Sequence, residues 1–379
     1  MTTVYETDDH RAIRDQTKRF VEAEVKPHGD TWEEQGFVPR DVLRKMGDIG
    51  FFGLRVPEEH GGIGMGALTS VVFAEELGRS TYGGFSATVL VHSDMASPHL
   101  FHSGSEEQIT RWSEGILSGE TLTAIAVTEP GAGSDVAGIR TTARREGDGF
   151  VVNGSKTFIT NGVHGDLFFV AAKTDSSAGS RGISLFLIPK ETKGFSVSRA
   201  LRKFGWNSSD TAELAFEDCW VGGESMLGEE NEGFYSIMRN FQNERVVLAA
   251  TAIGEAQAAI ELTLDYTKKR QAFGAPLYEK QAVRHRLAML QARIQGARQL
   301  VYWAGWAMEE GSDPTREVSM AKAVAGELVN EVMYACQQLF GGAGYMRESV
   351  IERMVRDARI HSIGGGTTEI MLEEIAKRS

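Results

Sequence analysis

The chain has 379 residues, of which 41% are hydrophobic and 24% are charged, and its formal net charge is −12. This length exceeds what one hydrophobic core usually fills, so we expect two or three packed units of a soluble globular protein. The acidic balance, without any basic stripe, argues against a nucleic-acid partner and against binding to anionic membranes.

The cysteine content and the hydropathy pattern indicate a cytoplasmic location. Only Cys219 and Cys336 are present, without a CxxC pair, which excludes a disulfide framework and fits a reducing compartment. The first residues, MTTVYETDDH, are acidic and lack the apolar segment of a secretory signal. The longest apolar run, residues 246–254, is about half as long as a membrane span, and we expect it inside a helix.

Residues 1–120 predict an N-terminal α-helical domain. Apolar residues recur at helical spacing over residues 68–77, and Gly78 follows at a natural helix stop. Ser105 is a suitable N-cap for another helix over residues 106–117.

Residues 121–225 predict a middle β domain, arranged as a barrel or a sandwich. Residues 141–162 alternate in polarity, and Gly-containing segments typical of tight turns interrupt them at 147–149 and at 153–154. Three further strands are predicted over residues 167–172, 182–189 and 213–221.

Residues 226–379 predict a C-terminal bundle of α-helices. Helical periodicity extends over residues 234–269, 281–310 and 314–340, and helices of this length suit an antiparallel four-helix bundle. Helices come before and after the strands without βαβ alternation, which argues against a Rossmann sheet. The predicted fold class is therefore α+β.

Two motifs of the middle domain suit a planar cofactor. Residues 126–138, AVTEPGAGSDVAG, end a strand in a turn whose backbone N–H groups and hydroxyls, from Thr128 and Ser134, would face outward. In residues 156–162, KTFITNG, Phe158 and Thr160 project from one face of a strand, where they would suit stacking and hydrogen bonding to a flavin ring. A plain surface loop and an exposed sheet face are the alternative interpretations.

Two motifs of the C-terminal domain have features of a binding site. Residues 270–281, RQAFGAPLYEKQ, are predicted to be helical, and residues 337–359 contain Gly341, Gly342 and Gly344 within a helical pattern. Glycine inside a helix costs stability unless the backbone must approach another group closely. A pyrophosphate and a tight corner between two helices are both compatible with these glycines.

These four motifs, in this order and at this spacing, resemble the acyl-CoA dehydrogenase family, and the resemblance runs through essentially the whole chain. Residues 210–221, 227–234 and 365–371 are similar to that family too. The resemblance is closest to the long-chain and isovaleryl branch, because of the position of the predicted catalytic base.

The resemblance implies that the protein binds FAD. The flavin would lie against Thr128, Ser134, Phe158 and Thr160, with Thr160 bonding flavin N5 and Phe158 standing where the family often has tryptophan. The FAD pyrophosphate and adenosine would bind across a subunit interface, at Arg270, Phe273, Gln281, Gln338, Gly341, Gly342 and Thr367. Sharing the cofactor between subunits implies a homotetramer built as a dimer of dimers.

The resemblance also implies the reaction. A carboxylate would remove the α-proton of an acyl thioester while the β-hydrogen passes as hydride to flavin N5, and an electron-transfer flavoprotein would accept the electrons. Ser134, Arg245 and Gly365 would contact the substrate, with the Gly365 backbone N–H polarising the thioester carbonyl. The substrate would be an acyl-CoA of fatty acid β-oxidation or the thioester of an acyl carrier protein. Gly83 and Gly84, before a helical stretch that floors the acyl pocket, would make the site roomier.

Glu244 is the predicted catalytic base. Many family members carry a glutamate at the position of Gly365, whereas the long-chain and isovaleryl branch has a glutamate before an arginine, as in Glu244–Arg245. Burial would raise the pKa of such a carboxyl toward the range of a general base. A solvated surface pair is the alternative, but both residues fall within an apolar helical stripe marked by Phe234, Ile237, Met238, Phe241 and Leu248.

Three other functions are compatible with the sequence. A flavin oxidase or monooxygenase would use the same scaffold with O2 as the acceptor. A base-independent acyl-thioester enzyme would bind similar substrates without a catalytic carboxylate. A metal-dependent hydrolase would use His92, His99 and His102, although no carboxylate completes a ligand set and packing is the commoner reason for histidines near one helix.

Overall fold

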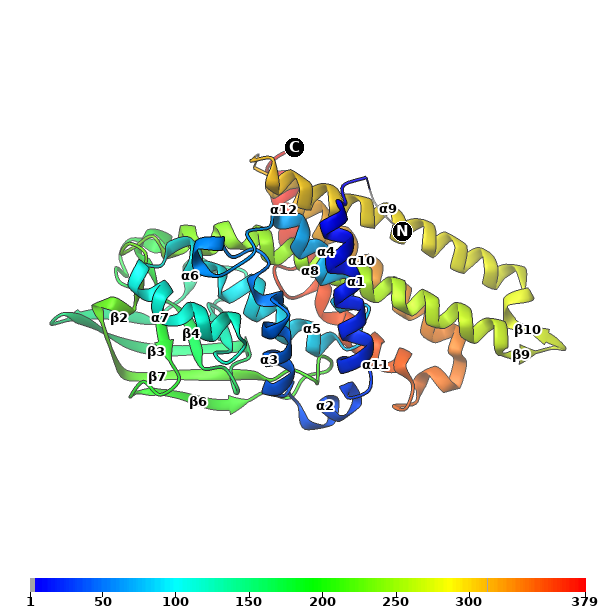
Figure 1. Ribbon diagram of the computed structural model, residues 1–379, viewed down its shortest axis with the longest axis horizontal. Coiled ribbons are helices and arrows are strands. Elements are labelled where there is room, and N and C mark those ends of the chain that lie inside the picture. The colour runs from blue at the N-terminus through cyan, green and yellow to red at the C-terminus, as the bar shows by residue number, and fades with distance from the viewer. Residues whose placement is uncertain (1–3, 312) are drawn as a thin grey trace.

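The computed structural model of the chain describes residues 4–311 and 313–379, in the predicted order of helices, strands and helices (Figure 1). Ser105 caps its helix as predicted, because its side chain accepts a hydrogen bond from the Gln108 backbone while the Gln108 side chain accepts one from the Ser105 backbone. The N-terminal helices are α1 (Asp8–Phe20), α2 (Gly29–Gln35), α3 (Arg40–Asp48), α4 (Ala67–Gly78), α5 (Gly83–Leu90), α6 (Pro98–Ser103) and α7 (Glu106–Leu117).

The strands of the middle region form one eight-stranded sheet with the order β6-β7-β3-β2-β4-β5-β8, and β1 pairs with β4. Most neighbours are antiparallel, while β4 is parallel to β1 and to β2. The predicted α+β class is confirmed. The strands are β1 (Thr123–Ala126), β2 (Thr142–Glu146), β3 (Gly149–Thr160), β4 (Leu167–Lys173), β5 (Ile183–Pro189), β6 (Phe195–Ala200), β7 (Thr211–Gly222) and β8 (Met226–Leu227).

The turn predicted at Asn153–Gly154 is wrong. These residues lie inside β3, where the pairing with β7 shifts register between Val152 and Gly154. Gly154 has a φ of +150°, and a Cβ there would lie 2.4 Å from the Thr141 side chain. The glycine therefore marks a β-bulge that bends a long strand, and the chain does not reverse there.

The helix predicted over residues 270–281 is also wrong. The strands β9 (Gln271–Ala272) and β10 (Ala275–Pro276) form a short hairpin, and a 3-10 turn over Leu277–Glu279 follows. Phe273 and Gly274 connect the strands, with φ of +54° and +78°. Positive φ at both central residues is the geometry of a two-residue hairpin turn, which no helix can include.

The C-terminal helices share one hydrophobic core with the N-terminal helices. Helix α8 joins the regions, because its first half packs against the sheet and α6–α7 while its second half lies in the shared core. These helices are α8 (Gly233–Lys269), α9 (Gln281–Glu309), α10 (Thr315–Phe340), α11 (Val350–Ala358) and α12 (Thr368–Ala376).

Within residues 4–311 and 313–379, α8 is the one helix that is long and apolar enough to cross a membrane. The sequence had not predicted an apolar run of that length. The relevant window is 83% buried inside the protein. A buried core helix passes the same test, so its apolar character is explained by packing.

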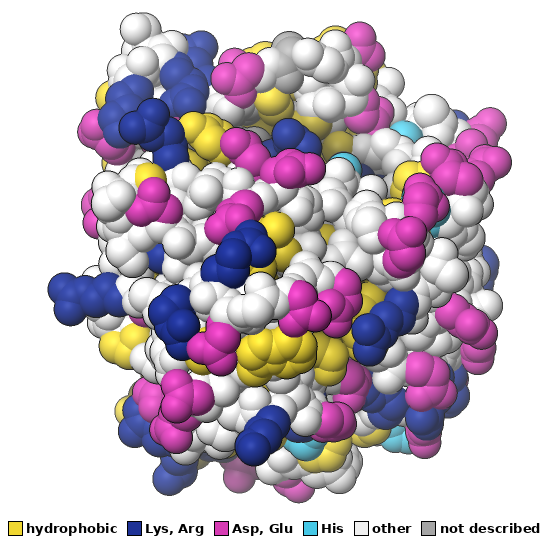
Figure 2. Space-filling view, turned by 90° about the vertical axis from the view of Figure 1, so that its left-hand side faces the viewer, with side chains coloured by type: hydrophobic (Ala, Val, Ile, Leu, Met, Phe, Trp, Pro, Cys, Tyr) yellow, Lys and Arg dark blue, Asp and Glu magenta, His cyan; other side chains and the backbone are white. Residues whose placement is uncertain are grey.

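The face at the sheet end of the molecule carries charges of both signs (Figure 2). Acidic and basic side chains alternate across this face, with a small group of hydrophobic side chains between them. Such mixing leaves no extended single-sign field on this face that would attract a polyanion.

Two glycines let α4 and α8 cross at close range. A Cβ at Gly78 would lie 2.3 Å from the Thr251 carbonyl oxygen, and a Cβ at Gly254 would lie 2.0 Å from the Glu75 carbonyl oxygen. Gly78 is the last residue of α4 and was predicted only as a stop signal. In the structure, the missing side chain of Gly78 allows the backbone of α8 to pack directly against α4.

We predict that Gly254→Ala destabilises the protein by about 1–3 kcal/mol, because the added methyl overpacks the α4–α8 crossing. Gly296→Ala in α9 is the matched control, since a Cβ there meets nothing within 4 Å. Alanine should leave stability unchanged or raise it at that position. Thermal unfolding midpoints measure both changes, and equal midpoints would contradict the crossing argument.

Candidate active site

Glu244 is a buried carboxyl on α8, at the junction of the three regions. It is 7% exposed, and it accepts a hydrogen bond of 3.2 Å from the Asn240 amide. Burial raises the pKa of Glu244 to about 7, against the lowering effects of the Asn240 hydrogen bond and the Arg245 charge. Arg245 is also 7% exposed, so the two residues are not a solvated surface pair.

Arg245, the residue after Glu244, lines a cavity of about 740 Å³, whereas Glu244 itself is not among the residues that line it. Its guanidinium lies 5.6 Å from the centre of the Phe241 ring, and burial lowers its pKa while Glu374 and Glu244 oppose that change. The walls come from the turn over residues 126–138, which we call the signature turn, and from the first half of α8, the α9–α10 junction and α12. They include Ser134, Met238, Met308, Pro314, Ile370 and Arg378. The structure therefore brings Ser134 and Arg245, the residues for which substrate contacts were predicted, to one cavity.

Gly365 approaches α8 through its backbone. Its φ is +63°, and a Cβ there would lie 2.3 Å from Leu248 Cδ1. Leu248 is one helical turn after Glu244. The loop before α12 thus comes within contact distance of the Glu244 side of α8, and a side chain at this position would require the Leu248 side chain to move.

Lys322 holds this loop, a role that the sequence reasoning missed. Its ammonium donates hydrogen bonds of 2.7 Å to the carbonyls of His361 and Gly366, on either side of Gly365. Lys322 is 2% exposed, and burial lowers its pKa to about 8. His361 is fixed in turn by a 3.0 Å contact between its Nε2 and Glu255 Oε2. A lysine inside the apolar stripe of α10 was the available signal.

The signature turn is braced from below by a buried ion pair. The Lys156 ammonium donates to Glu129 Oε1 at 2.8 Å and to the Val127 carbonyl at 3.0 Å. Glu129 also accepts the backbone N–H groups of Arg140 and Thr141, so it is not a free base. Above the brace the turn is open, because a Cβ at Gly131 or Gly133 would meet nothing within 4 Å.

Phe158 and Thr160 lie at the end of β3 near this turn. The pairing with β7 shifts between Lys156 and Ile159, and Phe158 has a φ of +61° and is 69% exposed. Asn161 fixes the strand end, since its amide donates to the carbonyls of Thr88 and Thr123 at 3.0 and 3.1 Å. An exposed phenyl ring beside a half-buried hydroxyl is a surface that a flat aromatic cofactor would cover.

The remaining predicted cofactor residues lie elsewhere in the chain. Tyr266 stacks on Phe340 at 4.1 Å, which brings the end of α10, with Gln338, Gly341 and Gly342, beside the end of α8, where Arg270 follows. Phe273, in the β9–β10 hairpin, is 96% exposed, and Gln281 begins α9 next to it. Figure 1 shows this hairpin at the opposite end of the molecule from the sheet. One chain therefore does not bring these residues to Phe158 and Thr160.

Thr367 belongs to the Gly365 loop. Its side chain caps α12 by accepting a hydrogen bond of 3.3 Å from the Ile370 backbone N–H. This predicted cofactor residue therefore lies next to the predicted substrate residue Gly365 and apart from the hairpin end.

The prediction of a roomier site at Gly83 and Gly84 is wrong. A Cβ at Gly83 would lie 2.6 Å from the Trp206 ring, and a Cβ at Gly84 would lie 2.5 Å from Ser208 Oγ. These glycines allow α5 to pack closely on the segment between β6 and β7. They create no free volume.

Two of the histidines that suggested a hydrolase, His92 and His99, make hydrogen bonds within the fold. His92 bonds Thr123 Oγ1 at 2.9 Å and the Ile116 carbonyl at 3.0 Å through its two ring nitrogens. His99 Nδ1 bonds Ser236 Oγ at 3.0 Å. Burial lowers the pKa of His92 to about 4 and that of His99 to about 3, as expected for neutral core histidines.

Three family models match consecutive parts of the chain. The model described as "Acyl-CoA dehydrogenase, N-terminal domain" matches residues 7–120, and the middle-domain model matches residues 124–219. The C-terminal-domain model matches residues 231–379. Together they span most of the chain, as the motifs predicted.

Curated relatives and solved structures agree with these models. The long-chain specific acyl-CoA dehydrogenase of Mus musculus is 43% identical over 98% of this chain and 86% of its own length. The isovaleryl-CoA dehydrogenase of Solanum tuberosum is 34% identical over 97% of this chain and 90% of its own. An acyl-CoA dehydrogenase structure from Geobacillus kaustophilus has a TM-score of 0.95 at 41% identity, covering 100% of this chain and 99% of that one. A structure titled "PigA with FAD and proline" has a TM-score of 0.95 at 28% identity, with the same coverage.

We predict that Glu244→Gln makes the protein more stable at pH 8. Because the pKa of Glu244 is raised from 4.5 to about 7, its contribution to folding stability is lost as pH rises through that interval. The loss corresponds to roughly 3 kcal/mol, which glutamine avoids. Thermal midpoints of the two proteins should converge near pH 5 and separate above pH 7. A constant difference across that range would contradict the raised pKa.

Proposed function

The chain belongs to the acyl-CoA dehydrogenase family, and we propose that it desaturates an acyl thioester with Glu244 as the α-proton base. The family establishes an FAD-dependent oxidoreductase that acts on the CH–CH group of acyl-CoA. The observation that carries the finer proposal is the Glu244 carboxyl, buried at the domain junction, with a pKa raised to about 7. A carboxyl with such a pKa combines a useful fraction of base with a strong affinity for the proton it removes.

The residues of this chain fit FAD, which supplies the hydride acceptor when it is bound. The open turn over Gly131 and Gly133, together with the exposed Phe158 ring, offers a surface for the flavin. We assign flavin contacts to Thr128, Ser134 and Thr160 as well. We assign the pyrophosphate and adenosine to Arg270, Phe273, Gln281, Gln338, Gly341, Gly342 and Thr367.

In the proposed mechanism, a Glu244 carboxylate oxygen takes the α-proton of the thioester. The backbone N–H of Gly365 would bind the thioester carbonyl oxygen and stabilise the negative charge that develops on it. Lys322 holds that N–H in place through the carbonyls of His361 and Gly366. Phe241 and Leu248 would exclude water from the reacting carbons, and Arg245 would limit the rise in the pKa of the base.

The thioester enters, in this proposal, through the 740 Å³ cavity beside Arg245. Arg239, Lys377 and Arg378 are among the residues that line this cavity, and their charges suit the phosphates of CoA. An acyl carrier protein would present the same thioester and remains a second carrier to test. We propose an electron-transfer flavoprotein as the electron acceptor and a cytoplasmic location, which the free thiols of Cys219 and Cys336 support.

We propose a homotetramer because Phe273 belongs to the hairpin at the end of the molecule opposite the sheet, whereas the flavin residues Phe158 and Thr160 belong to the sheet (Figure 1). A second copy would bring its hairpin end, with Arg270 and Phe273, to the flavin surface at Phe158 and Thr160. The exposed Phe273 ring, 96% accessible in the isolated chain, supports an interface at the hairpin.

Glu244→Gln is expected to lower the rate of flavin reduction by roughly 10²–10⁴-fold while FAD and substrate still bind. Bleaching of the flavin by a panel of acyl-CoAs, followed in single-turnover mixing, measures this rate. Glu369→Gln tests another nearby carboxylate, which is exposed on α12, and should keep the rate. Near-normal reduction by Glu244→Gln would refute the assignment.

Arg270→Ala is expected to weaken FAD retention and assembly together, because bound FAD would order the shared interface and stabilise it by mass action. Lys269→Ala is the matched control, since Lys269 is exposed and pairs only weakly with Asp265 on the surface. Flavin absorbance and light scattering measure the two properties. An Arg270→Ala protein with full FAD content and unchanged mass would contradict the shared site.

A further inference from the structure

A π-helix packs against α8 at the turn before Glu244. This segment, η4 (Val91–Ala96), lies between α5 and α6, and π-helical turns occur frequently at functional sites. The amide nitrogen of Asn243 donates to the Asp94 carbonyl at 2.8 Å. The amide nitrogen of Asn240 donates to the Met95 carbonyl at 2.9 Å and to the Asp94 carbonyl at 3.2 Å. Two asparagines of α8 therefore dock onto the backbone of η4.

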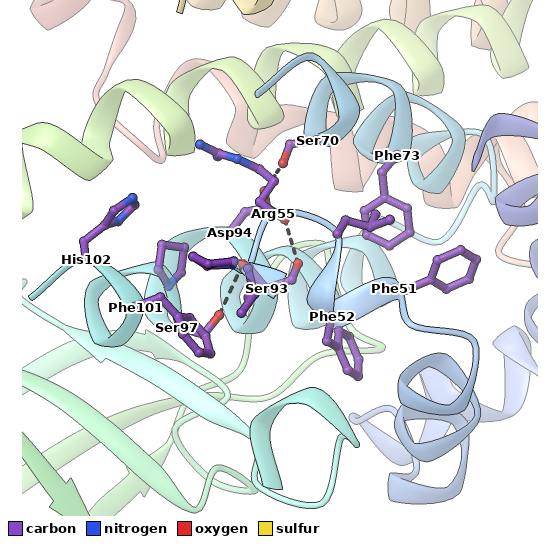
Figure 3. Close-up of a pocket in the computed structure, with 14 residues that line it drawn as sticks. Phe51, Phe52, Arg55, Ser70, Phe73, Ser93, Asp94, Ser97, Phe101 and His102 are labelled. Atoms are coloured by element: carbon purple, nitrogen blue, oxygen red, sulfur yellow. Dashed lines mark hydrogen bonds between the residues drawn. The ribbon is translucent and has the colours of Figure 1, made fainter. Parts of the chain in front are cut away.

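Hydrogen bonds fix Asp94 from its other side as well. Its carboxylate accepts from Ser70 of α4 at 2.5 Å and from Ser93 at 2.7 Å, and Figure 3 shows both serines turned toward it. Arg55, from the segment after Phe51–Gly53, donates to the Asn243 side-chain oxygen. This wall borders a cavity of about 90 Å³, so polar contacts supplement packing in holding η4 against α8.

Asn240 connects this wall to the base. Its amide nitrogen carries two hydrogens and faces three acceptors: the two η4 carbonyls and Glu244 Oε1 at 3.2 Å. In the part of the chain that the structure describes, Asn243 makes the same kind of contact to Asp94 without bonding Glu244. The two asparagines thus share the docking role, and Asn240 alone adds a bond to the carboxyl.

We propose that Asn240 is a positioning residue for Glu244: anchored on η4, its amide holds the carboxylate in one orientation and favours its ionised form. The inference rests on the proposed role of Glu244 as the base. A donor that is fixed before the reaction begins needs no reorganisation when the charge on the carboxyl changes.

The other charges around Glu244 are shared with other groups or partly cancel, so the Asn240 hydrogen bond should have a measurable effect on the pKa of Glu244. Arg245 of the same helix lowers the pKa of Glu244, but its charge is shared with Glu374 of α12 and opposed by Arg378. Asp94 from η4 and Arg55 carry opposite charges on the far side of the asparagines, where their effects on Glu244 partly cancel. Removing the Asn240 donor should therefore raise the pKa of Glu244.

The test is the pH dependence of single-turnover flavin reduction between pH 5 and 9, measured on FAD-loaded protein. Because the carboxylate is the active form, the rate rises with pH through the pKa of the base. Asn240→Leu should move the midpoint up by about one pH unit, so that the rate is about tenfold lower on the acid side and recovers above the new midpoint. Asn243→Leu removes a docking contact and the acceptor for Arg55 but no bond to Glu244, so it should leave the midpoint unchanged.

Asn240→Asp provides a second variant of the same shape in case leucine prevents folding. A carboxyl beside Glu244 should share a proton with it, and the profile should become a two-step curve shifted upward. An unshifted midpoint in a folded Asn240 variant, or an equal shift in Asn243→Leu, would overturn the inference. Glu244→Gln separates failure of this inference from failure of the proposed function. If Glu244→Gln is inactive and the Asn240 variant has an unshifted midpoint, only the role of Asn240 is refuted. If Glu244→Gln stays active, the proposed base itself is refuted.

Discussion

The desolvated carboxyl of Glu244 is the constraint on which the rest of the site depends. A carboxylate that is 7% exposed has lost most of its contact with water, so its ionised form is costly unless nearby groups stabilise it. Asn240 supplies one hydrogen bond and Arg245 supplies a nearby charge, and neither fully offsets burial, since the pKa stays near 7. The balance leaves a group that can be both ionised and strongly basic near neutral pH.

This balance requires α8, the Gly365 loop and the signature turn to be held in fixed positions relative to one another. Helix α8 lies between the sheet and the shared helical core, and close glycine contacts with α4 set its position. Lys322 fixes the Gly365 loop over the same part of α8, and the Lys156–Glu129 pair fixes the signature turn across the cavity. Each of these buried charged groups has partners in the fold, so their cost is offset while they position backbone atoms.

The features that the sequence predicted are those encoded locally. The periodicity of the long helices, the Ser105 cap and the inward position of Glu244 all depend on residues within a few turns of one another. The features that it missed depend on distant partners. Gly154 is a bulge because β7 pairs with it, and Gly83 is a packing glycine because Trp206 lies against it. Lys322 bonds carbonyls about 40 residues away, and nothing in its own helix identifies them.

The central claim is that Glu244 is a buried carboxyl which titrates near neutral pH. Infrared difference spectra of FAD-loaded protein labelled with ¹³C-glutamate, recorded from pH 5 to 9, test it most directly. The label separates Glu244 from Asp357, whose pKa burial also raises. We expect a protonated carboxyl band that disappears with a midpoint near 7 in the wild type and is absent from Glu244→Gln. Identical spectra for the two proteins, or a Glu244 band that is lost below pH 5, would contradict the account.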